Sequence, residues 1–211
     1  MNGTNFMIRV IWILFLLSSC GNLPITYIQN FSSINNVLIG FPDEEITQEI
    51  FDDYEYSFIK ARFGKGPISI LILAYEQDGI YQWSGLDDVS IYTFNGRVIK
   101  TTGLESNFQI SNPKPRLLSK TETRYESIDL YGPDLYQASL VSTFSESPKS
   151  IKRFGSKVSA IRIKETYSIP LINWKKSNYY FRNLDSGLIE LTEQSIHPKL
   201  PVLKIEFYYK F

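Results

Sequence analysis

The stretch VSIYTFNGRVIK, residues 89–100, decides the fold class of this chain. Apolar and polar side chains alternate over residues 89–94, which is typical of a strand, and RVIK at residues 97–100 reads as a second one. Between them stands Asn95-Gly96, the dipeptide that two-residue hairpin turns prefer because both positions need a positive φ. The stretch therefore predicts a tight β-hairpin.

Strand-like runs continue on both sides of this hairpin. Residues 68–75 contain the unbroken apolar run ILIL, which predicts a strand buried on both faces. Gly132-Pro133-Asp134 predicts a turn, and the Ser-, Pro- and Lys-containing residues 145–150 predict a loop. Further strands are expected at residues 56–63, 121–131, 136–145, 157–167, 179–182, 188–194 and 202–210.

Such a succession of strands without helical periods between them favours an antiparallel sheet. Tyr and Phe, both enriched in strands, number 14 each. We therefore expect a mainly β domain, built as a barrel, a half-open barrel or a sandwich, and the barrel-like form is favoured.

One short helix is expected near the start of the domain. Pro42 opens a segment in which Ile46, Ile50, Phe51 and Tyr54 fall on one face at helical spacing. Acidic residues follow Pro42 directly, where the positive end of a helix dipole favours them. The pattern indicates a helix that begins at this proline.

The N-terminal residues have the layout of a secretory signal. MIRVIWILFLL, residues 7–17, places one basic residue before a short apolar run, which is too short to cross a bilayer core of about 30 Å. We expect residues 1–20 to be a lipoprotein signal peptide, residues 21–36 a flexible tether, and residues 37–211 a single β-rich domain. The chain of 211 residues requires only one core.

Leu17-Ser18-Ser19-Cys20-Gly21 resembles the lipobox of bacterial lipoproteins. In that pattern the cysteine is acylated and becomes the mature N-terminus, and the acyl chains hold the protein at a membrane. An incidental cysteine is the alternative. Gly21 follows this cysteine, whereas the signal for retention in the inner membrane has aspartate at that position. We therefore expect the protein on the periplasmic side of the outer membrane.

Composition excludes several classes of function. Lys plus Arg and Asp plus Glu number 22 each, so no net field favours nucleic acid as a partner. One cysteine and one histidine, His197, give no pattern for a metal, a cofactor or a catalytic triad. Neighbouring acids point in different directions and do not form a glycosidase pair. These neighbouring acids are Glu44-Glu45, Asp52-Asp53 and Asp87-Asp88. We therefore expect no metal, no cofactor and no enzymatic activity.

Three separated blocks resemble the YjbF/GfcB family of lipoproteins. The opening segment is IKARFGKGP, residues 59–67, and the next block contains Trp83 and NGRVIKTTGL, residues 95–104. The closing block runs from residue 178 to residue 194 and is followed by HPKLP at residues 197–201. Their order is that of the family.

This resemblance covers roughly residues 40–211 and implies an outer-membrane lipoprotein of exopolysaccharide or group 4 capsule biogenesis. It implies other export proteins as partners and no established catalytic residues. The leading hypothesis is a noncatalytic accessory protein of polysaccharide secretion.

The alternative is a carbohydrate-binding module that holds the exported polymer. Aromatic side chains interleaved with polar ones can stack on sugar rings, and we expect Trp83, Trp174 and Tyr179 to do so if the chain binds polysaccharide. Packing in the core is the competing explanation for each of these aromatic residues. A glycan hydrolase ranks third, because the acids show no paired arrangement.

Overall fold

The computed structural model describes residues 42–43, 45–86, 88–111, 113, 123–132 and 134–210. Residues Phe41–Phe211 form one compact unit. The predicted signal peptide, the tether and Cys20 lie outside the described residues.

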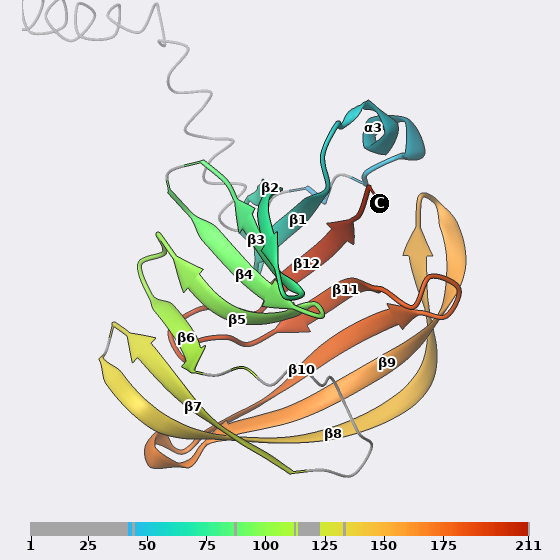
Figure 1. Ribbon diagram of the computed structural model, residues 1–211. Helices are drawn as coiled ribbons and strands as arrows, with labels where there is room; N and C mark the ends of the chain where they lie inside the picture. Colours follow the sequence, from blue (N-terminus) through green and yellow to red (C-terminus); the bar gives the residue numbers. More distant parts are fainter. Residues whose placement is uncertain are drawn as a thin grey trace, which may run out of the picture. The chain divides into compact units, whose positions relative to one another are not determined.

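Within these residues the chain forms a closed antiparallel barrel of twelve strands, in which β1 pairs with β2 on one side and with β12 on the other (Figure 1). Each remaining strand pairs with its neighbours in sequence. The mainly β, barrel-like prediction is confirmed. The strands are β1 Phe58–Phe63, β2 Ile68–Gln77, β3 Ile80–Ser84, β4 Ser90–Phe94, β5 Arg97–Thr102, β6 Asn107–Ser111, β7 Arg124–Tyr131, β8 Leu135–Arg153, β9 Ser156–Ile169, β10 Trp174–Asn183, β11 Ile189–Gln194 and β12 Leu203–Tyr208.

The predicted hairpin joins β4 to β5, where Phe94 pairs with Arg97. Asn95 and Gly96 have φ values of 48° and 75°, as a two-residue turn with two positive φ angles requires. A Cβ built on Gly96 would lie 2.5 Å from Cγ2 of Ile189, so the turn also packs too closely on β11 for a side chain. Glycine is needed here for two separate reasons.

The hairpin of β8 and β9 is much longer than predicted. Its pairing runs without interruption from Val141 opposite Ser168 to Arg153 opposite Ser156. The loop predicted at residues 145–150 is therefore wrong, because these polar residues sit in a strand whose outward side chains face water. Strands β3 and β6 were not among the predicted runs.

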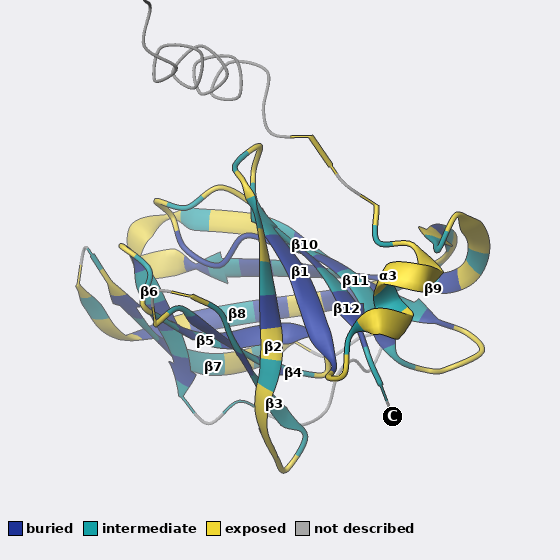
Figure 2. Ribbon diagram, turned by 90° about the horizontal axis from the view of Figure 1, so that it is seen from above, coloured by how far each residue is buried: buried dark blue, intermediate teal, exposed yellow. Residues whose placement is uncertain are grey.

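The prediction that residues 68–75 are buried on both faces is also wrong. In β2 only Leu71 is buried, and the next residue, Ile72, keeps 42% of its surface exposed. Figure 2 shows the contrast between β2 and the largely buried β1 beside it. The barrel covers only one face of β2, because an antiparallel sheet needs only one packed face.

The short helix is present as α3 Gln48–Asp53. It begins six residues after Pro42, because Oγ1 of Thr47 accepts a hydrogen bond of 3.2 Å from the backbone N–H of Ile50 and so caps the helix. No helical residue is buried. Phe51 nevertheless contacts the barrel, with its ring centroid 5.4 Å from that of Phe154 and 6.2 Å from that of Tyr208.

Candidate functional site

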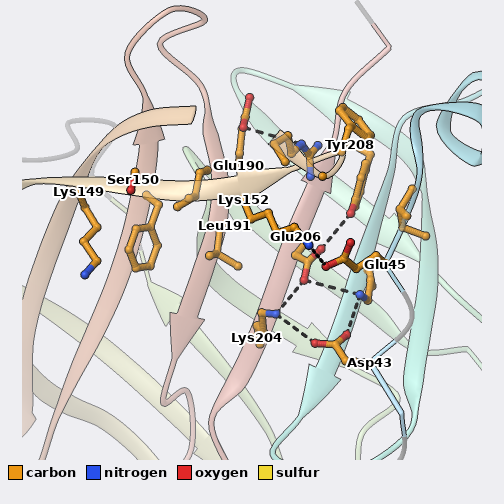
Figure 3. Close-up of a pocket in the computed structure, with 17 residues that line it drawn as sticks. Asp43, Glu45, Lys149, Ser150, Lys152, Glu190, Leu191, Lys204, Glu206 and Tyr208 are labelled. Carbon is orange, nitrogen blue, oxygen red and sulfur yellow. Dashed lines mark hydrogen bonds and ion pairs between the residues drawn. The ribbon is translucent and has the colours of Figure 1, made fainter. Parts of the chain in front are cut away.

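A cavity of about 440 Å³ opens on the outer wall of the barrel. It forms because the tip of the β8–β9 hairpin reaches over to α3 and β12 instead of continuing along the sheet (Figures 1 and 3). We call this cavity the hairpin groove. It lies between residues 149–155 of the hairpin and the wall residues Lys60, Phe181, Leu191, Lys204 and Glu206.

Arg153 holds the tip of the hairpin in place. Its Nη2 donates a hydrogen bond to the backbone carbonyl of Phe207, and its guanidinium carbon lies 3.8 Å from the centroid of the Tyr208 ring. Its Nε lies 3.8 Å from a carboxylate oxygen of Glu190. One side chain thus joins the hairpin to β12 and to the residues of β11, which fixes the width of the groove.

Charged side chains on β1 and β12 line the opposite side. Lys204 and Glu206 are two positions apart on β12 and point outward together, while Lys60 stands opposite Glu206 in the register of β1 and β12. The Nζ atom of Lys204 lies 2.8 Å from Oε1 of Glu206, and that of Lys60 lies 3.7 Å from the same oxygen. Two cations therefore share one wall carboxylate.

Two further carboxylates come from the residues that precede α3. We call Pro42, Asp43 and Glu45–Thr47 the strap. Asp43 places Oδ1 2.7 Å from Nζ of Lys60 and Oδ2 3.5 Å from Nζ of Lys204, and it completes the cluster whose members Asp43, Lys204 and Glu206 are labelled in Figure 3. Glu45 lies 2.5 Å from Nζ of Lys152 on the hairpin. The strap thus contacts both sides of the groove.

The charge states of this cluster follow from its contacts. The hydrogen bond from Lys60 is the main reason why the pKa of Asp43 is lowered. Burial raises the pKa of Glu206, but Lys204, Lys60 and the hydrogen bond from Tyr208 together outweigh it, and the net shift is downward. Burial likewise opposes the charge on Lys204, yet Glu206 and Asp43 give its pKa a net rise. All three groups are held in their ionised forms.

A second charged cluster lies inside the barrel. Arg97 of β5 places Nη1 2.8 Å from Glu126 of β7 and Nη2 2.9 Å from Glu165 of β9. The other oxygen of Glu165 accepts hydrogen bonds from the Tyr180 hydroxyl at 2.5 Å and from Nδ2 of Asn178 at 3.3 Å. Arg97, Glu165 and Tyr180 are fully enclosed, so these contacts join three sides of the barrel interior and are not open to a ligand.

Electrostatics keep this interior cluster ionised despite its burial. Burial favours neutral Glu165, but Arg97 and the hydrogen bonds to the carboxylate give its pKa a net decrease. Burial also opposes the charge on Arg97, but Glu165, Tyr180 and Glu126 together more than offset it, and the pKa of Arg97 is raised. The pKa of Tyr180 is raised, chiefly by burial, so its hydroxyl remains a donor.

The predicted contact residues do not form one surface. Trp83 is fully buried in the core, where its ring N–H donates a hydrogen bond of 2.8 Å to Oγ1 of Thr93. Its assignment as a polysaccharide contact is corrected, because a ring without exposed surface cannot stack on a sugar. Trp174 packs edge-on against Tyr167, at a centroid distance of 5.1 Å.

Tyr179 lies on the opposite face of β10 from Trp174. It packs against the small outer cluster of Ile151 and Phe181, both of which line the hairpin groove. The guanidinium of Arg162 lies 5.6 Å from the centroid of its ring. Of the three predicted aromatic residues, Tyr179 alone adjoins the groove. The charged residues of the groove were not predicted from the sequence; these are Asp43, Lys60, Lys204 and Glu206.

His197 is buried, and its Nδ1 accepts a hydrogen bond of 3.1 Å from the backbone N–H of Lys199. Burial, followed by the charge of Lys199, lowers its pKa, so the ring is held neutral. Over the described residues, no three His, Cys, Asp or Glu side chains gather where they could hold a metal ion. In that same part of the chain, no helix combines the length and the apolar character needed to cross a membrane.

Comparison with solved structures gives the class of the fold. The chain is similar to the hypothetical lipoprotein YmcC from Escherichia coli (K12), with a TM-score of 0.69 and 17% identity over 90% of this chain and 98% of that one. The two chains thus share a fold, which in the described residues of this chain is a closed antiparallel β-barrel. No curated protein matches the chain.

The family follows from a match over residues 31–208, to the family described as group 4 capsule polysaccharide lipoprotein GfcB, YjbF. The chain belongs to this family. The resemblance predicted from Trp83, the Asn-Gly hairpin and the C-terminal blocks is confirmed.

Proposed function

We propose that this protein is a noncatalytic, lipid-anchored accessory of polysaccharide secretion, which acts on the periplasmic side of the outer membrane through contacts with other export proteins. Its membership of a capsule polysaccharide lipoprotein family carries the proposal. The polymer assisted is a capsular polysaccharide or a related exopolysaccharide.

The anchor assigned in this proposal is Cys20, which directly follows the apolar run of the signal peptide. Acyl chains on this cysteine contribute about 0.8 kcal/mol for each buried CH₂ group, and more than one chain is needed for stable attachment. Gly21 after the cysteine supports the outer membrane as the destination. The folded unit would then act close to the membrane surface.

The interior acids support a noncatalytic role. Glu126 and Glu165, which the fold brings together from separate strands, both contact Arg97, and Glu165 is enclosed and held ionised. A general acid must carry a proton and reach its substrate. Glu165 does neither.

A deletion strain tests the proposal. We expect less secreted and surface-bound polysaccharide after deletion, restored by the intact gene but not by a Cys20→Ala version exported through an ordinary signal peptide. Immunoblots of both complemented strains control for the amount of protein. Unchanged polysaccharide in the deletion strain would overturn the proposed function, and full restoration by Cys20→Ala would overturn the need for the anchor.

Polysaccharide binding is the second candidate function, and the hairpin groove favours it. Ligand pockets usually measure about 300–1,000 Å³ and combine an apolar lining with a few polar groups. The groove, at about 440 Å³, has Phe181 and Leu191 on its wall beside the charged cluster of Lys60, Lys204 and Glu206. This combination suits a sugar ring that carries a charged substituent.

A further inference from the structure

We propose that the hairpin groove binds a carboxylate-bearing segment of an acidic polysaccharide, and that the strap occupies the same cation sites in the free protein. This inference rests on the proposed function, since it takes a polysaccharide as the ligand. The argument comes from the charges, the burial and the exposure of the residues that line the groove.

Without the strap, the residues that line the groove carry more positive than negative charges. Five cations line it, against two carboxylates from β11 and β12, so the barrel and the hairpin contribute three excess positive charges. The two carboxylates of the strap, Asp43 and Glu45, reduce this excess to one. The cations are Lys60, Lys149, Lys152, Arg153 and Lys204, and the carboxylates of the wall are Glu190 and Glu206.

Lys60 is the cation that most needs a partner. Its side chain is only 5% exposed, and Asp43 at 2.7 Å is a closer partner than Glu206 at 3.7 Å. A buried cation without a close anion is costly, so any departure of Asp43 favours another carboxylate in its place. Lysine suits a single carboxylate because its ammonium group is a compact point charge with three donors.

The strap is held by contacts that a competing anion can replace. The side chain of Asp43 is 48% exposed and that of Glu45 is 63% exposed, as is 62% of the side chain of Lys152. The ion pair of Glu45 and Lys152, which is exposed on both sides, contributes little to stability, and the half-exposed Asp43 can be replaced at Lys60 by another carboxylate. The helix after the strap has no buried residue and contacts the barrel through the half-buried ring of Phe51, outside the strap. The strap therefore acts as an internal competitor of moderate strength.

The apolar wall supplies the second half of a sugar site. The half-buried Leu191 lies in the groove beside Phe181 and Ile151, which keep 9% and 7% of their surface exposed, within the outer cluster that Tyr179 joins. The C–H face of a pyranose ring packs on apolar and aromatic side chains, while its carboxylate reaches the cations. A uronic acid offers both groups on one ring, whereas a neutral sugar offers only the first. The geometry thus favours acidic over neutral polymers.

Calorimetric titration of the full chain in detergent micelles tests this inference, with oligogalacturonate as the probe and a maltooligosaccharide of equal length as the neutral comparison. At pH 7 and low salt, we expect the double variant Asp43→Asn/Glu45→Gln to bind oligogalacturonate about five- to tenfold more tightly than the wild type. We expect Lys204→Gln to bind at least fivefold more weakly, and added salt to weaken all binding.

Lys175→Gln is the matched control, because Lys175 is an exposed lysine of β10 outside the groove. Its affinity should equal that of the wild type. Lys204 is used instead of the buried Lys60 because 37% of its side chain is exposed, and thermal unfolding should verify that each variant folds.

Equal affinity of the strap variant and the wild type would overturn the competition between strap and ligand. Equal binding of the neutral oligosaccharide, an unchanged affinity of Lys204→Gln, or tighter binding of a phosphorylated mannan than of oligogalacturonate would overturn the assigned ligand. If the titration shows no binding but the deletion strain loses its polysaccharide, only the ligand assigned to the groove is refuted. Unchanged polysaccharide in the deletion strain refutes the proposed function, whatever the titration gives.

Discussion

The guanidinium group of Arg153 lies over the ring of Tyr208, with its central carbon 3.8 Å from the ring centroid. This contact joins the tip of the longest hairpin to the last strand of the barrel. Arg153 also reaches the carbonyl of Phe207 and the carboxylate of Glu190, and so helps to hold the hairpin over the groove together with Phe154, whose ring centroid lies 6.0 Å from that of Tyr208.

Replacing Arg153 should therefore release the hairpin tip without unfolding the barrel. For Arg153→Met we expect a loss of about 1–2 kcal/mol in the free energy of unfolding, from the lost cation–π contact and hydrogen bond. Hydrogen exchange should become faster in residues 149–157. Lys157→Met, an exposed position on the same hairpin, is the control and should change neither quantity. Unaltered exchange in Arg153→Met would show that the hairpin holds its position without this side chain.

A comparison of Gly96 with Gly155 distinguishes the cost of backbone strain from the cost of steric crowding. Both have positive φ, at 75° and 76°, but a Cβ on Gly96 would lie 2.5 Å from Cγ2 of Ile189, and one on Gly155 would meet nothing within 4 Å. We expect Gly155→Ala to cost about 1–2 kcal/mol in denaturant unfolding and Gly96→Ala about 1–3 kcal/mol more. Equal costs would mean that Ile189 moves aside freely.

The interior ion pairs of Arg97 should be among the most sensitive positions of the fold. Arg97→Met leaves Glu165 buried without its cation, and we expect a loss of about 3–5 kcal/mol in the free energy of unfolding. Adding Glu165→Gln to Arg97→Met should cost less than the sum of the two single changes, because the unpaired charge is removed as well. Additive losses in a double-mutant cycle would refute coupling between the two residues.

His197 should titrate below pH 6.5. Its pKa in the folded state is lowered from the usual histidine value of 6.5, first by burial and then by the charge of Lys199. The unfolded chain thus binds the proton more readily, so the contribution of His197 to stability is present above pH 6.5 and is lost as the pH falls through the lower folded pKa. The chain has one histidine, so its imidazole signals in an NMR titration report this group alone. A midpoint at or above 6.5 would contradict the enclosed, neutral ring.

Local chemistry made part of the fold predictable. Asn95-Gly96 specifies its turn within two residues, and the predicted hairpin is confirmed. The helix was placed too early because the capping hydroxyl of Thr47 decides where it begins, and the apolar pattern does not show this. The loop predicted at residues 145–150 failed because Pro148 and its polar neighbours can occupy a strand that is solvated on its outer face.

The groove could not be predicted in the same way. Lys60 and Glu206 meet only because β12 closes the barrel against β1, and no local pattern reports that closure. One weak signal was present in β12, where Lys204 and Glu206 alternate with the buried Leu203, Ile205 and Phe207 and so mark an outward charged pair. The interior pair of Arg97 and Glu165 lies 68 residues apart and left no such signal.

Closure of the barrel also limits how another protein can recognise this chain. Every strand in the described residues has a neighbour on both sides over part of its length, so a partner can add a strand of its own only where an edge extends past its neighbour, as at residues 143–153 of β8, which pair with β9 alone. The shortest pairing is between β5 and β6, in which Lys100 opposite Gln109 is the one paired position. Elsewhere on the barrel, a partner has to bind side chains and loops. Point substitutions on the outer surface can therefore abolish the binding of one partner and keep that of another without disturbing the backbone pairing.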